Sequence, residues 1–596
     1  PQVPEIEIPM GAADGELLIK FVPEMSDILD QTLTRAGGIS TRSGIPSTDE
    51  VLNILGAYHF ERVFPVDPKT EKRTREAGMH LWYIVRFDKD TDLKEAARQL
   101  RKLGEISKIQ SNPTIRRAYD PKKKPLYLSA SDLQHVTRTS EGLTFNDPGL
   151  KHQWHYQNTG SYDFVKEGAE AIAGADVNCG EAWKLCKGDP TIIVAVLDEG
   201  VMWNHPDLIG NMWTNEAEEI GSTEDKDGNG YKGDRYGYNF VKNTGVISWT
   251  SAEDTGHGTH VAGTIAAVNG NNKGVGGIAG GDGTENSGVK IMTCQLFDGA
   301  YGCTLAAEAK AIKYAADNGA VILQCSWGYN SPDANEALGY TPGPKDEQDW
   351  ENQYPLEKEA LDYFIHNAGS PNGVIDGGLA IFASGNEYAP SSSYPAGYSK
   401  CISVSAIAAD FTPSSYTNYG EEITLCAPGG DGDYYGTPGV ADDEFAWEGK
   451  TQGLILSTAI KNGQPAYAYM EGTSMACPHV SGVAALGLSH AVKERRHFKV
   501  AEFIELMKET ANDQFYNFYD EKVEKLYYYN HTTFGAPPTL MNLIERKGKM
   551  GRLVDAGALL KAIGNHGSDM IVPNVYLATG KSTSIDLARY FIDGES

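Results

Sequence analysis

The chain has 596 residues, of which 40% are hydrophobic and 22% are charged, a composition typical of folded globular proteins and a length sufficient for about three domains. Its 80 acidic and 52 basic residues give a formal net charge of −28, which argues against nucleic acid and anionic lipid as partners, although a well-solvated acidic surface explains the charge equally well. The apolar runs are far shorter than the ~20 residues of a membrane-spanning helix, so no transmembrane segment is expected.

Residues 1–118 have the pattern of a small α+β domain. Apolar and polar residues in strand-like runs predict strands over 15–21, 81–87 and 106–115. A helix is expected between the second and third strands, with Asp90 as its N-cap and Gly104 at its end. The chain opens at Pro1 without an initiator Met or an apolar signal segment, so any export signal is expected to have been removed or never supplied.

Residues 119–145 interrupt this regular pattern. The segment contains Pro121-Lys-Lys-Lys-Pro125, followed by a stretch rich in Ser and Thr, which is typical of an exposed linker. Exposed polar linkers are where chains are commonly cut by proteases. We therefore expect the chain to be processed in this region.

Residues 146–565 alternate between strand-like and helical segments. Apolar residues at helical spacing predict a helix over 305–316, and apolar runs predict strands over 191–197, 289–296, 320–325, 379–383 and 401–406. This alternation indicates an α/β fold with a doubly wound, mostly parallel sheet. The tail, residues 566–596, is expected to be a short C-terminal extension or the start of a truncated β domain.

The eight cysteines show no spacing typical of a zinc site. Cys294 and Cys325 lie in apolar strand-like segments and are expected to be buried free thiols. Cys179 and Cys186 flank a short helical stretch, so two interpretations stay open for them: a local disulfide or two free thiols.

Three residues that lie at strand ends or helix starts are candidate catalytic residues. In open α/β sheets, ligands bind at the edge formed by the carboxyl ends of the strands. Asp198 ends an apolar strand, His257 stands between two glycines at a helix start, and Ser474 begins another helix. Taken alone, Asp198 is equally typical of a loop residue and Ser474 of an N-cap. His257 and His260 have the spacing of a metal pair but lack the HExxH arrangement, and Cys477 is a thiol alternative to Ser474 that more closely fits a packed core residue.

Taken together, these segments resemble the subtilisin family of serine peptidases. The matching stretches are Leu197-Asp198-Glu-Gly, Asp254-Thr-Gly-His257-Gly-Thr-His and Gly472-Thr-Ser474-Met-Ala, in the order Asp, His, Ser. The resemblance covers roughly residues 146–565. It implies that Ser474 is the nucleophile, that His257 is its general base and then the general acid, and that Asp198 orients His257.

The same resemblance implies an oxyanion-binding residue and a substrate-binding segment. Asn386, in Ser-Gly-Asn after a predicted strand, matches the family's oxyanion-hole asparagine, which would act with the backbone N–H of Ser474. Ser326-Trp327-Gly328 matches the segment that pairs with extended substrate and walls the primary pocket, although Trp327 is bulkier than the residue usually found there. Glu199 is a departure, because the family usually has Thr or Ser after the catalytic aspartate.

An acidic loop after residue 224 is a candidate metal site. Its oxygen-bearing residues alternate with glycines, which is the arrangement of a calcium loop: Asp225, Asp227, Asn229, Tyr231 and Asp234. The EF-hand pattern is incomplete because Tyr236 occupies the position of its bidentate glutamate, and a plain acidic turn is the alternative. The resemblance favours structural Ca²⁺, because many subtilisin-like enzymes bind it.

The N-terminal domain, residues 1–118, resembles the propeptide of the subtilisin family. The resemblance implies an intramolecular inhibitor whose last strand leads into the substrate groove, with self-cleavage between residues 117 and 146. The sequence as a whole then predicts a secreted or cell-surface (periplasmic) serine endopeptidase, made as a zymogen, that acts on proteins or peptides. Two alternatives are a catalytically silent binding scaffold and a dedicated processing peptidase whose long segment 329–378 restricts access.

Overall fold

The computed structural model describes residues 3–115, 117, 125–128, 133, 144–162, 164, 168–435, 451–527 and 539–565. Most of the expected linker, including most of the region expected to be cleaved, and the whole expected C-terminal extension at 566–596 lie outside these residues. Within the described ranges, no helix combines the length and the apolar character needed to cross a membrane.

The N-terminal part folds around a five-stranded sheet with the order β2-β3-β4-β1-β5. The strands are β1 (Ala12–Phe21), β2 (Ile39–Ser40), β3 (His59–Arg62), β4 (Trp82–Arg86) and β5 (Ile106–Pro113). The central strand β1 pairs antiparallel with both β4 and β5. This arrangement agrees with the α+β domain expected from the sequence.

Both faces of this sheet are buried. Successive side chains of a strand point to opposite faces, and here apolar residues occupy consecutive positions, so each face carries apolar side chains. On β1, Leu17 and Ile19 belong to a core with residues of α1 (Ser26–Arg35), α2 (Pro46–Ile54) and α4 (Leu93–Leu100), whereas Leu18 belongs to a core of the large domain. The helix α4 begins two residues later than expected: Asp92, not Asp90, is its N-cap and accepts a hydrogen bond from the backbone of Glu95.

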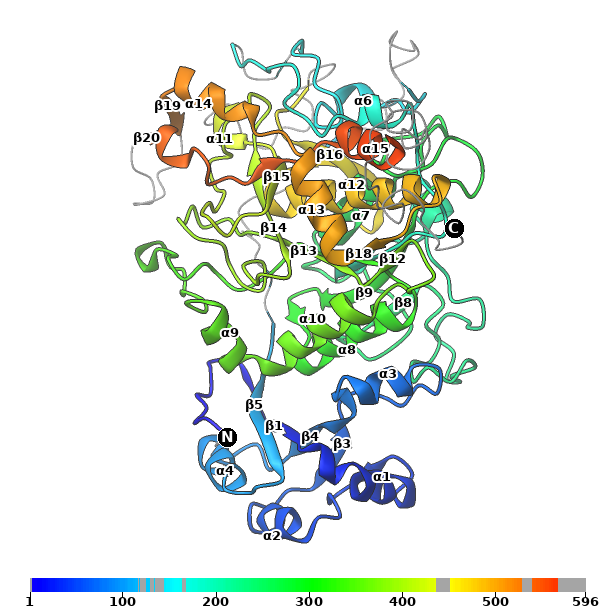
Figure 1. The fold of residues 1–596 in the computed structure, drawn as a ribbon, viewed down its shortest axis with the longest axis vertical. Helices are drawn as coiled ribbons and strands as arrows, with labels where there is room; N and C mark the ends of the chain where they lie inside the picture. The colour runs from blue at the N-terminus through cyan, green and yellow to red at the C-terminus, as the bar shows by residue number, and fades with distance from the viewer. Residues whose placement is uncertain are drawn as a thin grey trace, which may run out of the picture.

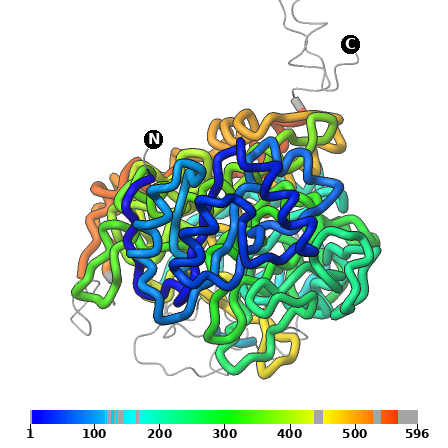
Figure 2. The backbone as a smooth tube through the Cα atoms, turned by 90° about the horizontal axis from the view of Figure 1, so that it is seen from below, coloured from blue at the N-terminus to red at the C-terminus, as the bar shows by residue number. Residues whose placement is uncertain are grey.

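The second face of this sheet is docked on two helices of the large domain, α8 (Leu305–Asp317) and α10 (Pro355–Asn367) (Figure 1). Glu359 of α10 accepts hydrogen bonds from the indole of Trp82 and, at 2.6 Å, from Lys20. Arg73 pairs with Asp317 of α8 at 2.7 Å. Viewed from below, the N-terminal domain extends over this side of the large domain (Figure 2). The segment 329–378 thus contains α10, one of the two helices that carry the N-terminal domain.

The large domain contains a nine-stranded sheet, in which eight strands follow the order β10-β9-β7-β11-β13-β14-β15-β21 and β8 pairs with β9. Its strands are β7 (Ile193–Glu199), β8 (Gly237–Asn239), β9 (Lys290–Asp298), β10 (Tyr301–Gly302), β11 (Ile322–Cys325), β13 (Leu379–Ala383), β14 (Ile402–Ile407), β15 (Leu425–Pro428) and β21 (Arg552–Leu553). All of the pairs are parallel except β9 with β10. The mostly parallel sheet confirms the expected fold class.

Helices cover both faces of the large sheet. One core contains residues of α7 (His257–Ala266), α12 (Thr473–Lys493), α13 (Val500–Thr510) and α15 (Ala556–Asn565), and a second core, on the other face, contains residues of α8 and α10. In Figure 1 these two helical layers lie above and below the strands. The hairpin β16 (Ile455–Lys461) and β17 (Gln464–Met470) leads into α12 and pairs with β6 (Leu126–Tyr127) from the expected linker.

All eight cysteines are unpaired. Cys294 and Cys325 are buried in β9 and β11, which confirms the expectation of buried free thiols. Cys179 and Cys186 do not form a disulfide: Cys179 is buried in the main core, and Cys186 packs at the edge of that core with its thiol on the carbonyl of Gly188. That alternative is therefore wrong in this structure.

Candidate active site

Three elements bring Asp198, His257 and Ser474 to the carboxyl edge of the large sheet. Asp198 is at the end of β7, His257 is the first residue of α7, and Ser474 is the second residue of α12. The glycines around His257 allow this approach. Gly256 has φ = 74°, and a Cβ on Gly258 would lie 2.3 Å from the carbonyl oxygen of Glu199. The helix can therefore start in contact with the strand that carries Asp198.

The imidazole of His257 is paired with the carboxylate of Asp198. Nδ1 of His257 lies 2.8 Å from Oδ1 and 2.9 Å from Oδ2 of Asp198, which is only 2% exposed. Burial lowers the pKa of His257, but the attraction of Asp198 and Glu199 outweighs it, so that pKa is raised. A proton on Nδ1 that is held by a carboxylate leaves Nε2 as the basic nitrogen.

A β-bulge explains why two consecutive carboxylates reach the same place. Successive side chains of a regular strand point to opposite faces. The pairing of β7 with β9 shifts register between Asp198 and Glu199, and both residues line one cleft. The rest of the cleft lining is Arg117, His257, Phe297, Ser326 and Trp327.

Ser474 contacts this cleft through Ser326. Its Oγ donates to the backbone carbonyl of Ser326 at 3.2 Å, and the Oγ of Ser326 donates to the carbonyl of Ser474 at 2.8 Å. Trp327 turns its indole N–H to the carbonyl of Leu197 at 2.8 Å and is 4% exposed, so its ring forms a buried wall. Gly328 lies where a Cβ would be 3.0 Å from the carbonyl of Tyr394, so this segment is tightly packed.

The amide of Asn386 lies close to the backbone N–H of Ser474. The Oδ1 of Asn386 accepts from the backbone and hydroxyl of Thr473, at 2.8 and 2.7 Å. The Nδ2 of Asn386 and the backbone N of Ser474 are 3.8 and 3.6 Å from the place where Gly472 would carry a Cβ. Two potential donors therefore lie near the same point, beside the nucleophile candidate.

The neighbouring alternatives do not have suitable geometry. His260 is buried, its Nε2 bonds two backbone carbonyls at 3.0 Å, and burial lowers its pKa to about 3, so it does not join His257 in a metal pair. Burial raises the pKa of Cys477 to about 12, and its thiol donates to Gln324, which fits a packed thiol. His479 is buried and bonds the carbonyl of Met475 at 2.6 Å, which fits a structural role.

The acidic loop places three carboxylates together, those of Glu218, Asp227 and Asp234, whose oxygens lie within 4.8 Å of one another. Carboxylate oxygens are the ligands that Ca²⁺ prefers, so this donor set fits it. Asn229 donates to Asp234 at 3.0 Å, and Tyr231 packs against Tyr314.

Asp225 has a different place in the loop. Its carboxylate accepts hydrogen bonds from the backbones of Gly228 and Gly230, both at 2.8 Å, so it holds the turn and is not part of the cluster of three. Glu218, which the sequence did not single out, is in the cluster. It precedes the loop pattern and has no motif that would mark it.

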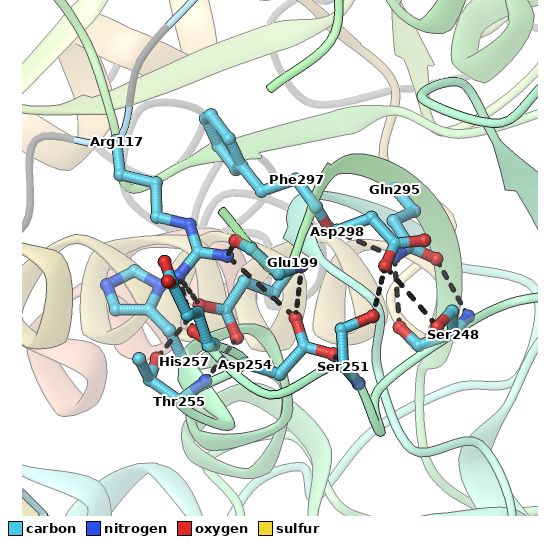
Figure 3. Close-up of polar contacts among 12 residues, drawn as sticks. Arg117, Glu199, Ser248, Ser251, Asp254, Thr255, His257, Gln295, Phe297 and Asp298 are labelled. Atoms are coloured by element: carbon cyan, nitrogen blue, oxygen red, sulfur yellow. Dashed lines mark hydrogen bonds and ion pairs between the residues drawn. The ribbon is translucent and has the colours of Figure 1, made fainter. Parts of the chain in front are cut away.

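Besides Phe297, the cleft contains one further residue that the sequence did not single out, Arg117. It comes from the N-terminal domain, and its Nη1 lies 2.6 Å from Oε1 of Glu199 (Figure 3). The sequence offers one signal, the Arg116-Arg117 pair at the end of that domain, but nothing in the spacing connects it with Glu199.

The subtilase family matches residues 189–529, which is more than half of the chain. The chain belongs to the subtilase family. This subtilase is 30% identical to a halolysin-like extracellular serine protease of Natrialba magadii, over 54% of this chain and 44% of the relative. It is also 30% identical to a calcium-dependent protease of a Nostoc species, over 56% of this chain and 43% of the relative.

The chain spans about half the length of these curated relatives. Among solved structures, it resembles fervidolysin from Fervidobacterium pennivorans, a keratinolytic enzyme related to subtilisin. The TM-score is 0.50 at 20% identity, over 94% of this chain and 63% of the other. This similarity supports the subtilisin-like fold.

Proposed function

We propose that this subtilase is a serine endopeptidase, made as a zymogen and secreted or held at the cell surface or in a periplasm. The observation that carries the proposal is the contact of His257 with Asp198 in a cleft whose wall, Ser326, also holds Ser474. The name of the extracellular relative supports the location.

In the proposed reaction, Oγ of Ser474 attacks the carbonyl carbon of a peptide bond while Nε2 of His257 takes the hydroxyl proton. The negative oxygen of the tetrahedral intermediate accepts hydrogen bonds from the backbone N–H of Ser474 and from Nδ2 of Asn386. The C–N bond then breaks as His257 gives its proton to the leaving amine, which leaves the acyl group on Ser474 as an ester. His257 next takes a proton from a water molecule that attacks this ester. The acid is released when the ester bond breaks and His257 returns the proton to Oγ of Ser474. Asp198 holds the imidazole and stabilises its cation throughout.

The N-terminal domain is proposed to be the inhibitory propeptide, cleaved between residues 117 and 146. Its last strand approaches the large domain beside the cleft: the backbone N–H of Ile115 donates to the carbonyl of Cys303 at 2.9 Å, and Asn112 accepts from the backbone of Ala306 at 3.0 Å. A Cβ on Gly302 would lie 2.0 Å from the carbonyl of Ile115, so the two segments are in close contact. The docked domain would also assist folding, because it supplies native contacts to the large domain, whose parallel sheet is of a kind that forms slowly.

Expression of the full chain and of a Ser474→Ala variant tests this function. The wild type is expected to shorten at its N-terminus, with a new terminus between residues 118 and 146, and to degrade an unfolded protein. The variant is expected to stay full length. An unprocessed wild-type chain that also fails to degrade any unfolded protein supports the scaffold alternative instead.

We also propose that the acidic loop binds structural Ca²⁺. The support is the cluster of Glu218, Asp227 and Asp234, the proximity of Asn229, and the name of the calcium-dependent relative. Burial raises the pKa of Asp234 to about 6, which marks a carboxylate that a nearby cation would stabilise in its ionised form. The ion would hold the loop and takes no part in the proposed hydrolysis.

A further inference from the structure

Glu199 presents a buried carboxylate to the cleft. Its side chain is 3% exposed and accepts hydrogen bonds from the backbone and hydroxyl of Thr255, at 3.0 and 2.9 Å. These donors fix its position but carry no positive charge. The cation that pairs with it is Arg117, which comes from the N-terminal domain.

The surroundings of Arg117 match the shape of a guanidinium group (Figure 3). One Nη contacts Glu199 at 2.6 Å and the carbonyl of Glu253 at 3.2 Å. The other lies 3.8 Å from Asp254 and donates to the carbonyl of Gly299. The guanidinium carbon is 5.8 Å from the centre of the Phe297 ring. Carboxylates, carbonyls and an aromatic ring together satisfy a planar cation with several donors.

The acidic groups are held in place before any ligand arrives. Asp254 accepts hydrogen bonds from the backbones of Ser251 and Gly299, both at 2.8 Å. Ser251 in turn donates to Asp298 at 2.6 Å. Because these bonds lie within the large domain, the subsite keeps its form when the N-terminal domain leaves.

Removal of the N-terminal domain would take away the guanidinium that pairs directly with Glu199 and leave His257 as the neighbouring group that can carry a positive charge. A buried charge that loses its partner is strongly destabilised, so the free enzyme gains most from a substrate that restores a positive charge there. Arg117 follows Ile115, whose backbone pairs with Cys303. It also precedes the region proposed to be cleaved, so it enters the cleft from the N-terminal side of that cleavage.

We propose that Glu199 and Asp254 form a subsite for an arginine or lysine side chain on the N-terminal side of the cleaved bond, and that Arg117 fills this subsite in the zymogen. The proposal rests on the peptidase function and adds to it the substrate class. Glu199 would thus determine specificity. The family usually has Thr or Ser at this position, and the carboxylate found here instead would select a basic side chain.

Matched peptides test the subsite. A peptide with Arg at varied positions before the cleaved bond is compared with the same peptide carrying citrulline, which has a similar shape and no charge. The processed wild type is expected to favour Arg in kcat/KM by on the order of tenfold or more at one position. Glu199→Gln is expected to bring that ratio close to one, while Glu285→Gln, the same change on an exposed loop, keeps it.

Two further measurements separate the possible failures. Labelling by a fluorophosphonate reports on Ser474 without any subsite, so normal labelling with equal cleavage of both peptides overturns the subsite and leaves the peptidase function standing. A double-mutant cycle in the full chain with Ser474→Ala requires no turnover and no free groove. Arg117→Gln and Glu199→Gln should each lower the unfolding temperature, and together they should lower it by less than the sum of the two losses, because either change alone breaks the pair. Additive losses overturn the proposal even where labelling fails.

Discussion

The cleft and the acidic loop solve the same electrostatic problem in different ways. In the loop, Asp225 is satisfied by the backbone of its own turn, and Asp234 accepts hydrogen bonds from Asn229 and Tyr314. In the cleft, Glu199 meets a cation from another domain. Carboxylates that are satisfied by their own loop and by a bound ion would hold a structure together, whereas a carboxylate that pairs with a side chain from another domain can recognise a substrate side chain. Changes in the cleft should therefore alter turnover, and changes in the loop should alter stability.

The largest effect on turnover is expected from Asp198→Asn. The amide keeps the shape but removes the charge that orients and stabilises the His257 cation, and the corresponding change in serine proteases lowers kcat about 10⁴-fold. The measurement is kcat on a peptide substrate, and a thermal unfolding curve of each protein shows that the variant is folded. Asp282→Asn, the same change on an exposed loop, is the control. A loss of less than tenfold would contradict the role assigned to Asp198.

A smaller loss of turnover is expected from Asn386→Leu. This change removes one of the two donors proposed to bind the developing oxyanion, and such a loss costs about 10²–10³ in kcat in enzymes of this type. The effect should appear in kcat with KM nearly unchanged, because the donor acts mainly in the transition state. A change confined to KM would place Asn386 in ground-state binding instead.

The loop variant Asp227→Asn should show the opposite behaviour. Ca²⁺ at about 100 times its Kd is expected to stabilise the wild type by about 2.7 kcal/mol, which appears as a higher unfolding temperature that EDTA reverses. The variant should lose most of this response while its folded fraction keeps its kcat. The absence of any calcium response in the wild type would overturn the metal assignment.

The sequence was sufficient to predict the position in the fold of the residues that belong to strong motifs. Asp198, His257, Ser474 and Asn386 each stand at the end of an apolar strand or the start of a helix, so local pattern and chain order predict where they lie. Glu218 and Arg117 have no such marks, because their roles depend on which loops pack together. The bulge after Asp198 is also a tertiary feature, and without it Glu199 would be expected on the opposite face of β7.

The smallest effect is expected on stability, and it comes from two buried carboxyls, those of Glu308 and Glu357. Burial raises the pKa of Glu308 well above its ordinary value and also raises that of Glu357, whose oxygens accept from Trp350 and Tyr329. The folded state therefore binds more protons than the unfolded state above pH ~4.5, so the free energy of unfolding should fall as pH rises from there.

Glu308→Gln should weaken this pH dependence, because the amide donates to Glu357 without needing a proton. Urea unfolding of the variant and wild type between pH 5 and 8 measures it, with the exposed Glu505→Gln as control. Parallel curves for Glu308→Gln and the wild type would show that the pair is not the source.

Mapping where a fluorophosphonate attaches tests most directly whether Ser474 is the nucleophile. With the N-terminal domain removed, by added active enzyme where a variant does not process itself, we expect one modified peptide, which carries the label on Ser474. The Asp198→Asn protein should stay unlabelled within the time that saturates the wild type. A label on another residue, or an unlabelled Ser474 in the fully processed chain, would contradict this assignment.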